Sequence, residues 1–301
     1  MQQQRSISDE LKHQYKTGGM LIKLIFINVI VFLVINLIGV IGRLSGGSTE
    51  ALLDGLVYDI FTIQTGLKAF ISHPWGLITS IFSHQGFIHL LFNMLLLYSF
   101  GRLFLQFFTQ KRLFYTFLVG GIFGGLFEIG SHIFPTISTT SAIGASGAVM
   151  AIIIAVAAHK PNLELNLFGT FKLKLFILAG VLFVANFISL GTVNVDGTAG
   201  TAHFAHIGGA VLGFISVKQL KSSTNIINMA QRFGDWFLSL FRKKPKLSVN
   251  KGDTRRMSDE DYNQDKKLRQ EQVDKILDKI SKSGYESLSK KEKDFLFKQS
   301  K

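Results

Sequence analysis

Six long apolar segments constrain the fold of this chain more than any other feature of its sequence. The segments are Met20–Ile41, Phe82–Gly101, Leu113–Glu128, Ile143–His159, Leu173–Leu190 and Ala202–Val217. Each is apolar and long enough to form a helix across the roughly 30 Å hydrocarbon layer of a bilayer. Because a membrane-spanning backbone must satisfy its own hydrogen bonds, we predict an all-α polytopic membrane protein with a six-helix bundle.

The charged residues are concentrated after this apolar region. Residues 1–221 hold 14 basic and 8 acidic side chains, whereas the shorter stretch 222–301 holds 19 and 12. The chain contains no cysteine, which excludes disulfide frameworks and Cys-based metal sites. We therefore expect four parts: a cytoplasmic N-terminal segment (1–19), a six-span membrane domain (20–221), an amphipathic basic interfacial helix (222–247) and a cytoplasmic helical hairpin tail (248–301).

The distribution of lysine and arginine predicts the orientation. Twelve of these residues lie on one side of the predicted bundle, and only Arg43 and Lys68 lie on the other. Short cytoplasmic loops collect basic residues, so both termini are expected in the cytoplasm. A secretory signal is the alternative for the first segment, but its apolar stretch is too long and no small-residue cleavage site follows closely. We expect a multi-pass protein of a bacterial cytoplasmic membrane.

Several polar residues lie inside the predicted spans, where they are costly unless they face the bundle interior. His89 and Asn93 are spaced i, i+4 and therefore share one helix face. Ser146 lies in a Gly-Ala-Ser-Gly run, and His203 and His206 are spaced i, i+3 in the last span. The second, fourth and last spans all run inward from the outer side, so these residues are expected to meet in the outer third of the bilayer.

A serine near a histidine supports nucleophilic catalysis. The hydroxyl of Ser146 needs a base to take its proton, and His206 is the natural candidate. The spans contain no aspartate, and Glu128 and Asp196 lie at span ends or in loops, so a Ser–His dyad is expected rather than a triad. His89, Asn93 and the backbone N–H of Ser146 are candidate donors to an oxyanion.

These motifs together resemble the rhomboid intramembrane serine proteases over residues 70–217. The motifs are Trp75, His84, the H-x-x-x-N of His89 and Asn93, the G-x-S-G of Gly144 to Gly147, and the A-H-x-x-G-x-x-x-G of Ala205 to Gly213. The resemblance implies a six-helix bundle with an outward-opening cavity, Ser146 as nucleophile, His206 as base, and His89 with Asn93 at the oxyanion. It also implies transmembrane protein substrates and no metal or cofactor.

The remaining motif residues are expected to support the site rather than react. They are Gly144, Gly147, His203, Gly209, Gly213, His84 and Trp75. Two positions depart from the family pattern. Gly76 follows the loop tryptophan where an arginine is frequent, and Met150 stands where a tyrosine is frequent, which puts loop packing and the ring stacked on His206 in doubt.

The membrane domain has several alternative interpretations besides a serine protease. Ser146 alone is typical of a small residue that permits helix packing. A catalytically inactive relative that binds transmembrane segments would be expected to lack the serine or the histidine, and both are present. A transporter or proton channel would more often show internal repeats and acids in its spans. Metalloprotease and aspartyl protease sites are excluded, since no H-E-x-x-H string and no aspartate occur in the spans.

The polar end of the chain has its own predicted contacts. Residues 222–247 combine an apolar face bearing Trp236 with a basic cluster, which favours anionic lipid headgroups over nucleic acid. The cluster consists of Arg242, Lys243, Lys244 and Lys246. Ser258–Lys282 and a shorter helix opened by the capping-box string Ser289 to Glu292 predict the hairpin, which buries too little apolar surface to be stable alone and is expected to dock on a partner or on the membrane body.

Overall fold

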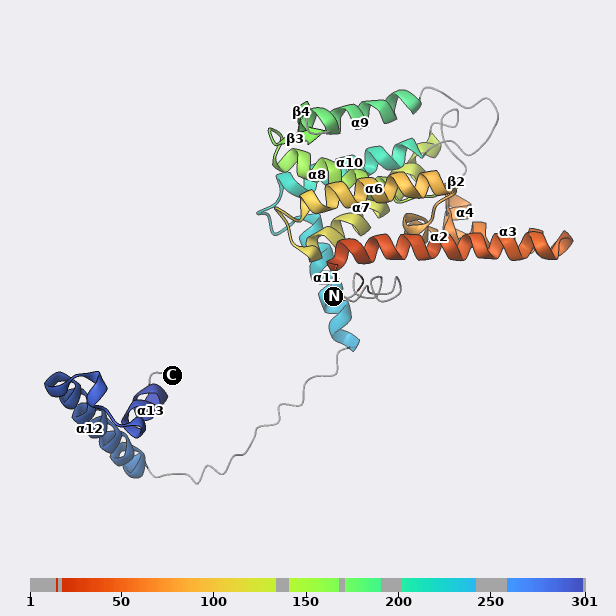
Figure 1. Cartoon of the computed structure of the whole chain (residues 1–301). Helices are drawn as coiled ribbons and strands as arrows, with labels where there is room; N and C mark the ends of the chain where they lie inside the picture. The colour runs from red at the N-terminus through yellow and green to blue at the C-terminus, as the bar shows by residue number, and fades with distance from the viewer. Residues whose placement is uncertain are drawn as a thin grey trace, which may run out of the picture. The chain divides into compact units, whose positions relative to one another are not determined.

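The computed structural model describes residues 15, 18–133, 141–167, 171–190, 202–241 and 259–299 (Figure 1). The chain divides into two compact units, residues 1–242 and residues 243–301. The first contains the membrane bundle and the second contains the tail. The basic cluster at Arg242, Lys243, Lys244 and Lys246 lies outside the described residues.

Helices occupy all six predicted spans, which confirms the all-α polytopic fold. They are α2 (Gly19–Ser45), α6 (Phe87–Phe104), α7 (Gln110–Gly130), α8 (Ser146–His159), α9 (Leu175–Leu190) and α10 (His203–Lys218). Among the described residues, α2, α6 and α7 are at least 18 residues long and apolar enough to cross a membrane by themselves. Of the other three, α8 and α9 are shorter than the predicted spans, at 14 and 16 residues, whereas α10 has the predicted length of 16 residues.

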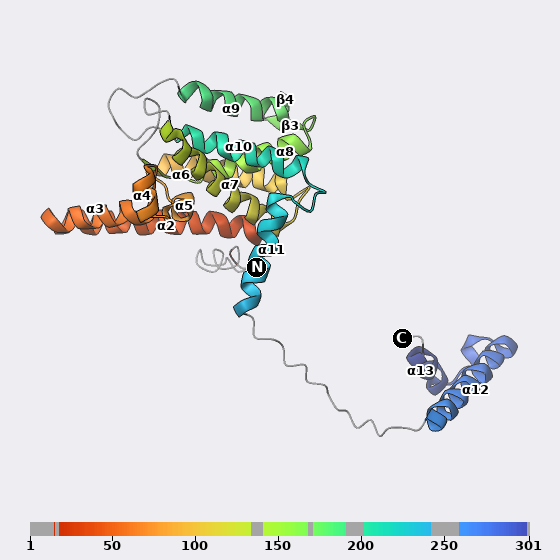
Figure 2. The same ribbon diagram turned by 180° about the vertical axis from the view of Figure 1, so that it is seen from behind.

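The short helix α8 forms the centre of the bundle. Ten of its 14 residues are buried, and α6, α7, α9 and α10 all contact it. Small side chains make this possible, because glycines on the neighbouring helices let the backbones approach closely. A Cβ at Gly120 of α7 would lie 2.5 Å from the Ala151 Cβ, and one at Gly213 of α10 would lie under 3.0 Å from the Ala151 carbonyl oxygen. In both views α2 and α9 lie on opposite flanks of the bundle (Figures 1 and 2).

The long connection between α2 and α6 is more ordered than the sequence indicated. It contains α3 (Gly47–Phe61), β1 (Ile63–Gln64), α4 (Leu67–Ser72), α5 (Gly76–Thr79) and the 3-10 turn η1 (Ser80–Phe82). Helix α3 folds back against the end of α2, where Gly42 lies beside Glu50 and Leu53. Strand β1 pairs antiparallel with β2 (Ser141–Ala142), so the connection is tied to the segment before α8.

Two further elements lie at the side of the bundle that carries most of its lysine and arginine residues. A short antiparallel hairpin of β3 (Glu164–Leu167) and β4 (Phe171–Lys174) links α8 to α9. Helix α11 (Ile226–Phe241) begins against α7 and α10, where Arg112 of α7 donates to the Asn228 side chain and to the Ser216 carbonyl, each at 2.9 Å. Since Ser216 lies in the last turn of α10, this cation also complements the negative end of that helix.

The second unit is a helical hairpin. It comprises α12 (Asp259–Ser283), the 3-10 turn η3 (Tyr285–Ser287) and α13 (Lys290–Gln299). The Ser289 N–H donates to the Glu292 carboxylate at 2.6 Å and the Ser289 Oγ accepts from the Glu292 N–H at 3.4 Å, which is the expected capping box. Hydrogen bonds from the Ser289 hydroxyl and N–H to the carboxylate, together with the Lys279 ammonium, lower the pKa of Glu292 from 4.5 to about 2.

Candidate active site

Ser146 is the first residue of α8 and follows a turn that only glycine adopts easily. Gly144 has φ +134°, and its N–H donates to the Ser80 carbonyl of η1 at 3.0 Å. A Cβ at Gly144 would lie 2.8 Å from the His89 ring and 3.8 Å from the Ser146 Oγ. The missing side chain at Gly144 therefore leaves the His89 ring and the serine hydroxyl facing the same small space.

That space opens into a cavity of about 650 Å³. Residues from the first connection, α6, the segment before α8 and the start of α10 line it, namely Tyr58, Thr62, Gln85, Gly86, His89, Ser141, Ala142, Ile143, Ser146 and Ala202. Of the residues predicted from sequence for the reaction, Ser146 and His89 line the cavity. A volume of this size admits several residues of an extended peptide, which is compatible with a macromolecular substrate.

His206 reaches this region through the tight contact between α8 and α10. Gly147, directly after Ser146, lies beside Ala205, directly before His206: a Cβ at Gly147 would lie 2.9 Å from the Ala205 carbonyl oxygen. Gly209, one turn further along α10, packs on the Gly147 backbone in the same way. The two glycines predicted to support the site thus set the spacing between the helices that carry Ser146 and His206.

The histidines form a group around this contact. His203 and His206 are three residues apart in the first turns of α10 and therefore lie on one face of that helix. His84 is 1% exposed and meets the His89 ring edge to face, with centroids 5.1 Å apart. The buried His84 ring packs against the His89 ring and is not among the residues that line the cavity. Direct contact between the Ser146 hydroxyl and the His206 ring stays a prediction.

The Asn93 side chain bonds to the backbone of its own helix. Its side chain is buried, and its Nδ2 donates to the His89 carbonyl at 2.9 Å. This i to i−4 bond stabilises the turn of α6 that carries His89. Asn93 is therefore a neighbour of His89, and its role at the oxyanion stays a prediction.

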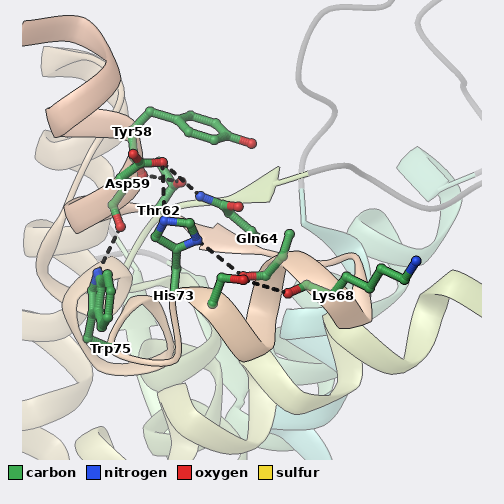
Figure 3. Close-up of polar contacts among 9 residues, drawn as sticks. Tyr58, Asp59, Thr62, Gln64, Lys68, His73 and Trp75 are labelled. Atoms are coloured by element: carbon green, nitrogen blue, oxygen red, sulfur yellow. Dashed lines mark hydrogen bonds and ion pairs between the residues drawn. The ribbon is translucent and has the colours of Figure 1, made fainter. Parts of the chain in front are cut away.

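Hydrogen bonds and ring packing around Asp59 stabilise the connection between α2 and α6 beside the cavity (Figure 3). The Trp75 Nε1 donates to the Asp59 carbonyl at 2.8 Å, and the Gln64 side chain donates to the Asp59 carboxylate at 3.1 Å. His73 lies 3.7 Å from that carboxylate and packs edge to face on Trp75. These contacts hold the end of α3, which carries Tyr58 to the cavity, against α4 and α5.

Both departures from the family pattern have a structural setting. At Gly76 a Cβ would lie under 3.0 Å from the Thr62 carbonyl oxygen, so the residue after Trp75 has no room for any side chain. The backbone itself thus packs the loop where an arginine is frequent in the family. Met150 is buried within α8.

The sequence predicted no role in the site for one buried acid. Glu128 is 1% exposed at the end of α7, and its Oε2 accepts from the Ala205 N–H of α10 at 3.0 Å. A lone acid near the end of an apolar span was the available signal, but its partner lies 77 residues away in sequence. In the part of the chain that the structure describes, no three His, Asp or Glu side chains are grouped to hold a metal ion.

Both units resemble known protein families. A family model described as the Rhomboid domain matches residues 72–221, and one described as a family of unknown function (DUF6576) matches residues 258–301. RHOMBOID-like protein 6, mitochondrial, from Arabidopsis thaliana is 32% identical over 169 residues, which are 54% of this chain and 50% of that protein. Rhomboid protein 1, mitochondrial, from Saccharomyces cerevisiae is 29% identical over 156 residues, or 49% and 42%. The chain thus spans about half the length of the curated relatives it matches.

Proposed function

This chain belongs to the rhomboid family of multi-pass membrane proteins, and we propose on that basis that it is an intramembrane serine endopeptidase. Its substrates are transmembrane proteins, cut in or near their membrane-spanning segments. The observation that carries the proposal is the position of Ser146 at the start of a buried helix, facing the cavity beside His89.

The length of α8 supports hydrolysis inside the membrane. Its 14 residues rise about 21 Å, whereas the hydrocarbon layer is roughly 30 Å thick. The last residue of α8 precedes Lys160, which lies on the side of the bundle that carries most lysines and arginines. Because α8 is shorter than the hydrocarbon layer is thick, Ser146 at its other end lies below the opposite membrane surface. A water-accessible cavity is then needed at the serine, and the lining polar groups of Gln85, Ser141 and His89 suit one.

The proposed reaction has two steps. The Ser146 Oγ attacks the substrate carbonyl carbon while His206 takes the hydroxyl proton, and the resulting oxyanion is held by the Ser146 N–H and the His89 ring. The Ser146 N–H can take this role because the first N–H groups of α8 have no acceptor within the helix. The helix dipole also favours an anion at this end. His206 then protonates the leaving amine, and water hydrolyses the acyl-enzyme by the same route.

The arrangement of the chain in the membrane is a further part of the proposal. Both termini lie on the cytoplasmic side, since twelve of fourteen lysine and arginine residues before position 222 fall there. The curated relatives carry mitochondrial names, and the bacterial membrane expected from the sequence stays a prediction.

A fluorophosphonate probe tests the nucleophile directly. Detergent-solubilised wild type should label and should cut a model transmembrane substrate, whereas Ser146→Ala and His206→Ala should lose both activities. Ser239→Ala and His159→Ala are matched controls, because they remove a serine of α11 and the histidine at the end of α8 opposite Ser146. Both controls should keep most labelling.

One result would replace the proposal. If folded wild type neither labels nor cuts, but still retains transmembrane segments in a binding assay, the chain is an inactive rhomboid-like protein that binds such segments.

A further inference from the structure

We infer that Glu128 is a positioning residue for the proposed reaction: its carboxylate fixes the first turn of α10 and thereby the place of His206 relative to Ser146. This inference rests on the proposed function, which supplies the reason why that distance matters. It assigns a role to a buried acid that composition and motif analysis left unused.

The first observation is a helix start that lacks its own cap. The first four N–H groups of a helix have no intrahelical acceptor, and a side chain at the N-cap normally accepts from one of them. The N-cap of α10 is Ala202, which makes no side-chain cap. Glu128 of α7 supplies the missing acceptor from another helix, by taking the Ala205 N–H at 3.0 Å.

The second observation is that the Ala205 peptide groups are held from two helices at once. Glu128 accepts from the Ala205 N–H, while the Ala205 carbonyl oxygen lies against Gly124 of α7 and Gly147 of α8. Hypothetical Cβ atoms at those two glycines would lie 2.6 and 2.9 Å from that oxygen. Ala205 directly precedes His206, and Gly147 directly follows Ser146, so a shift of Ala205 changes the relation between base and nucleophile.

The third observation is energetic. An acid buried at the end of a membrane helix is costly, and helix packing alone would be served as well by an apolar residue. A negative charge at the start of α10 is favourable for the dipole of that helix, and Arg112 provides the complementary charge at its end. Helix α7 thus holds α10 at both ends, and only the Glu128 end carries His206.

Three variants of the full-length protein separate positioning from general stability. Glu128→Ala removes the acceptor, Glu128→Gln keeps a carbonyl oxygen of the same reach, and Arg112→Gln weakens the opposite end of the same helix pair. Cleavage of a model transmembrane substrate in proteoliposomes gives kcat and KM for each variant, and thermal unfolding in detergent gives the loss of stability.

We expect Glu128→Ala to lower kcat roughly 10- to 100-fold with little change in KM, because a displacement of about 1 Å at a reacting group has an effect of that size. Glu128→Gln should restore most of kcat. Arg112→Gln should lower Tm by at least as much as Glu128→Ala but change kcat by less than about threefold. Backbone hydrogen exchange at Ala205 should be faster in Glu128→Ala than in wild type or Glu128→Gln.

The inference is overturned if Glu128→Ala keeps its kcat, if Arg112→Gln loses as much, or if Glu128→Gln behaves like Glu128→Ala. These results all presuppose an active wild type. A wild type without labelling or cleavage overturns the proposed function instead, and the exchange rate at Ala205 then reports on the contact alone.

Discussion

Gly209 of α10 lies so close to Gly147 of α8 that a Cβ on Gly209 would come within 3.0 Å of the Gly147 carbonyl oxygen. The two helix backbones are therefore in direct contact at the level of Ser146. We expect Gly209→Ala to destabilise the bundle by about 1–3 kcal/mol, the usual cost of overpacking, and to reduce cleavage strongly. Unfolding in mixed detergent micelles measures the first effect.

Gly180→Ala is the matched control for that substitution. Gly180 lies on α9, and a Cβ there would have no neighbour within 4 Å. It should leave both unfolding and cleavage unchanged. Equal stability of the two variants would show that the backbones of α8 and α10 separate easily, contrary to the close packing described above.

Gly144→Ala is expected to close the site rather than loosen the bundle. A side chain at this position combines an unfavourable φ of +134° with a Cβ 2.8 Å from the His89 ring. Cleavage should fall roughly 100-fold, since His89 must move away from Ser146. Gly86→Ala is its counterpart: Gly86 lines the same cavity with φ −154°, has open space around it, and should tolerate the methyl group.

The sequence predicted the helices of the bundle because each is a long apolar run, and the motif spacings placed Ser146 and His89 near one cavity. It did not predict α3, whose leucines Leu52 and Leu56 are exposed and mixed with acids, so no buried face marks it. Strands β1 and β2 are two residues each, too short for a periodic signal. The sequence did not predict the hydrogen-bond partners of Glu128 and Trp75. Both side chains bond to backbone atoms that only the tertiary fold brings close, and every residue type offers such atoms.

Trp75→Phe should weaken the connection beside the cavity. The change removes the Nε1 donor to the Asp59 carbonyl and keeps most of the ring packing on His73. We expect a loss of about 1 kcal/mol, the typical net value of one hydrogen bond, measured by the same unfolding assay. Trp236→Phe serves for comparison, because Trp236 is 57% exposed on α11. A larger effect at Trp236 than at Trp75 would contradict this assignment.

Helix α11 is expected to lie in the membrane interface with its aromatic face in the lipid. Its exposed large residues include Phe233, Trp236, Phe237, Leu240 and Phe241, and such a face binds at the headgroup boundary. The chain has two tryptophans and six tyrosines, so Trp75→Phe leaves Trp236 as the single tryptophan, whose emission is excited at wavelengths that tyrosine does not absorb. In proteoliposomes, bromine near the top of the lipid chains should quench its emission more than bromine deep in the bilayer. Efficient quenching by aqueous iodide instead would place α11 in solvent.

The tail predicts a pH response at Glu292. Its pKa is lowered to about 2, chiefly by Ser289, so the capping contact is fully present above pH 4.5 and is lost as the pH falls through about 2. Ser289→Ala should move the Glu292 titration midpoint upward toward 4.5 in carboxyl NMR spectra of the full-length protein. Ser287→Ala removes a neighbouring hydroxyl that donates to Gly284 and should leave the midpoint unchanged. An unmoved midpoint in Ser289→Ala would assign the shift to the backbone N–H of residue 289 or to the Lys279 ammonium, which the substitution leaves in place.

The shortness of α8 has a consequence for how lipid thickness acts on this protein. Ten of its residues are buried and none is exposed. Although α8 is shorter than the hydrocarbon layer is thick, it is therefore surrounded by protein rather than by lipid tails. We expect α2 to take up hydrophobic mismatch by tilting instead, because its 27 residues bear the exposed side chains Ile30, Leu33 and Leu37. In a thicker membrane the geometry around Ser146 stays fixed while its depth below the surface grows. For the proposed protease, we then expect a substrate helix to meet Ser146 at a residue further from its own membrane boundary, so that the cut site moves along the substrate with membrane thickness.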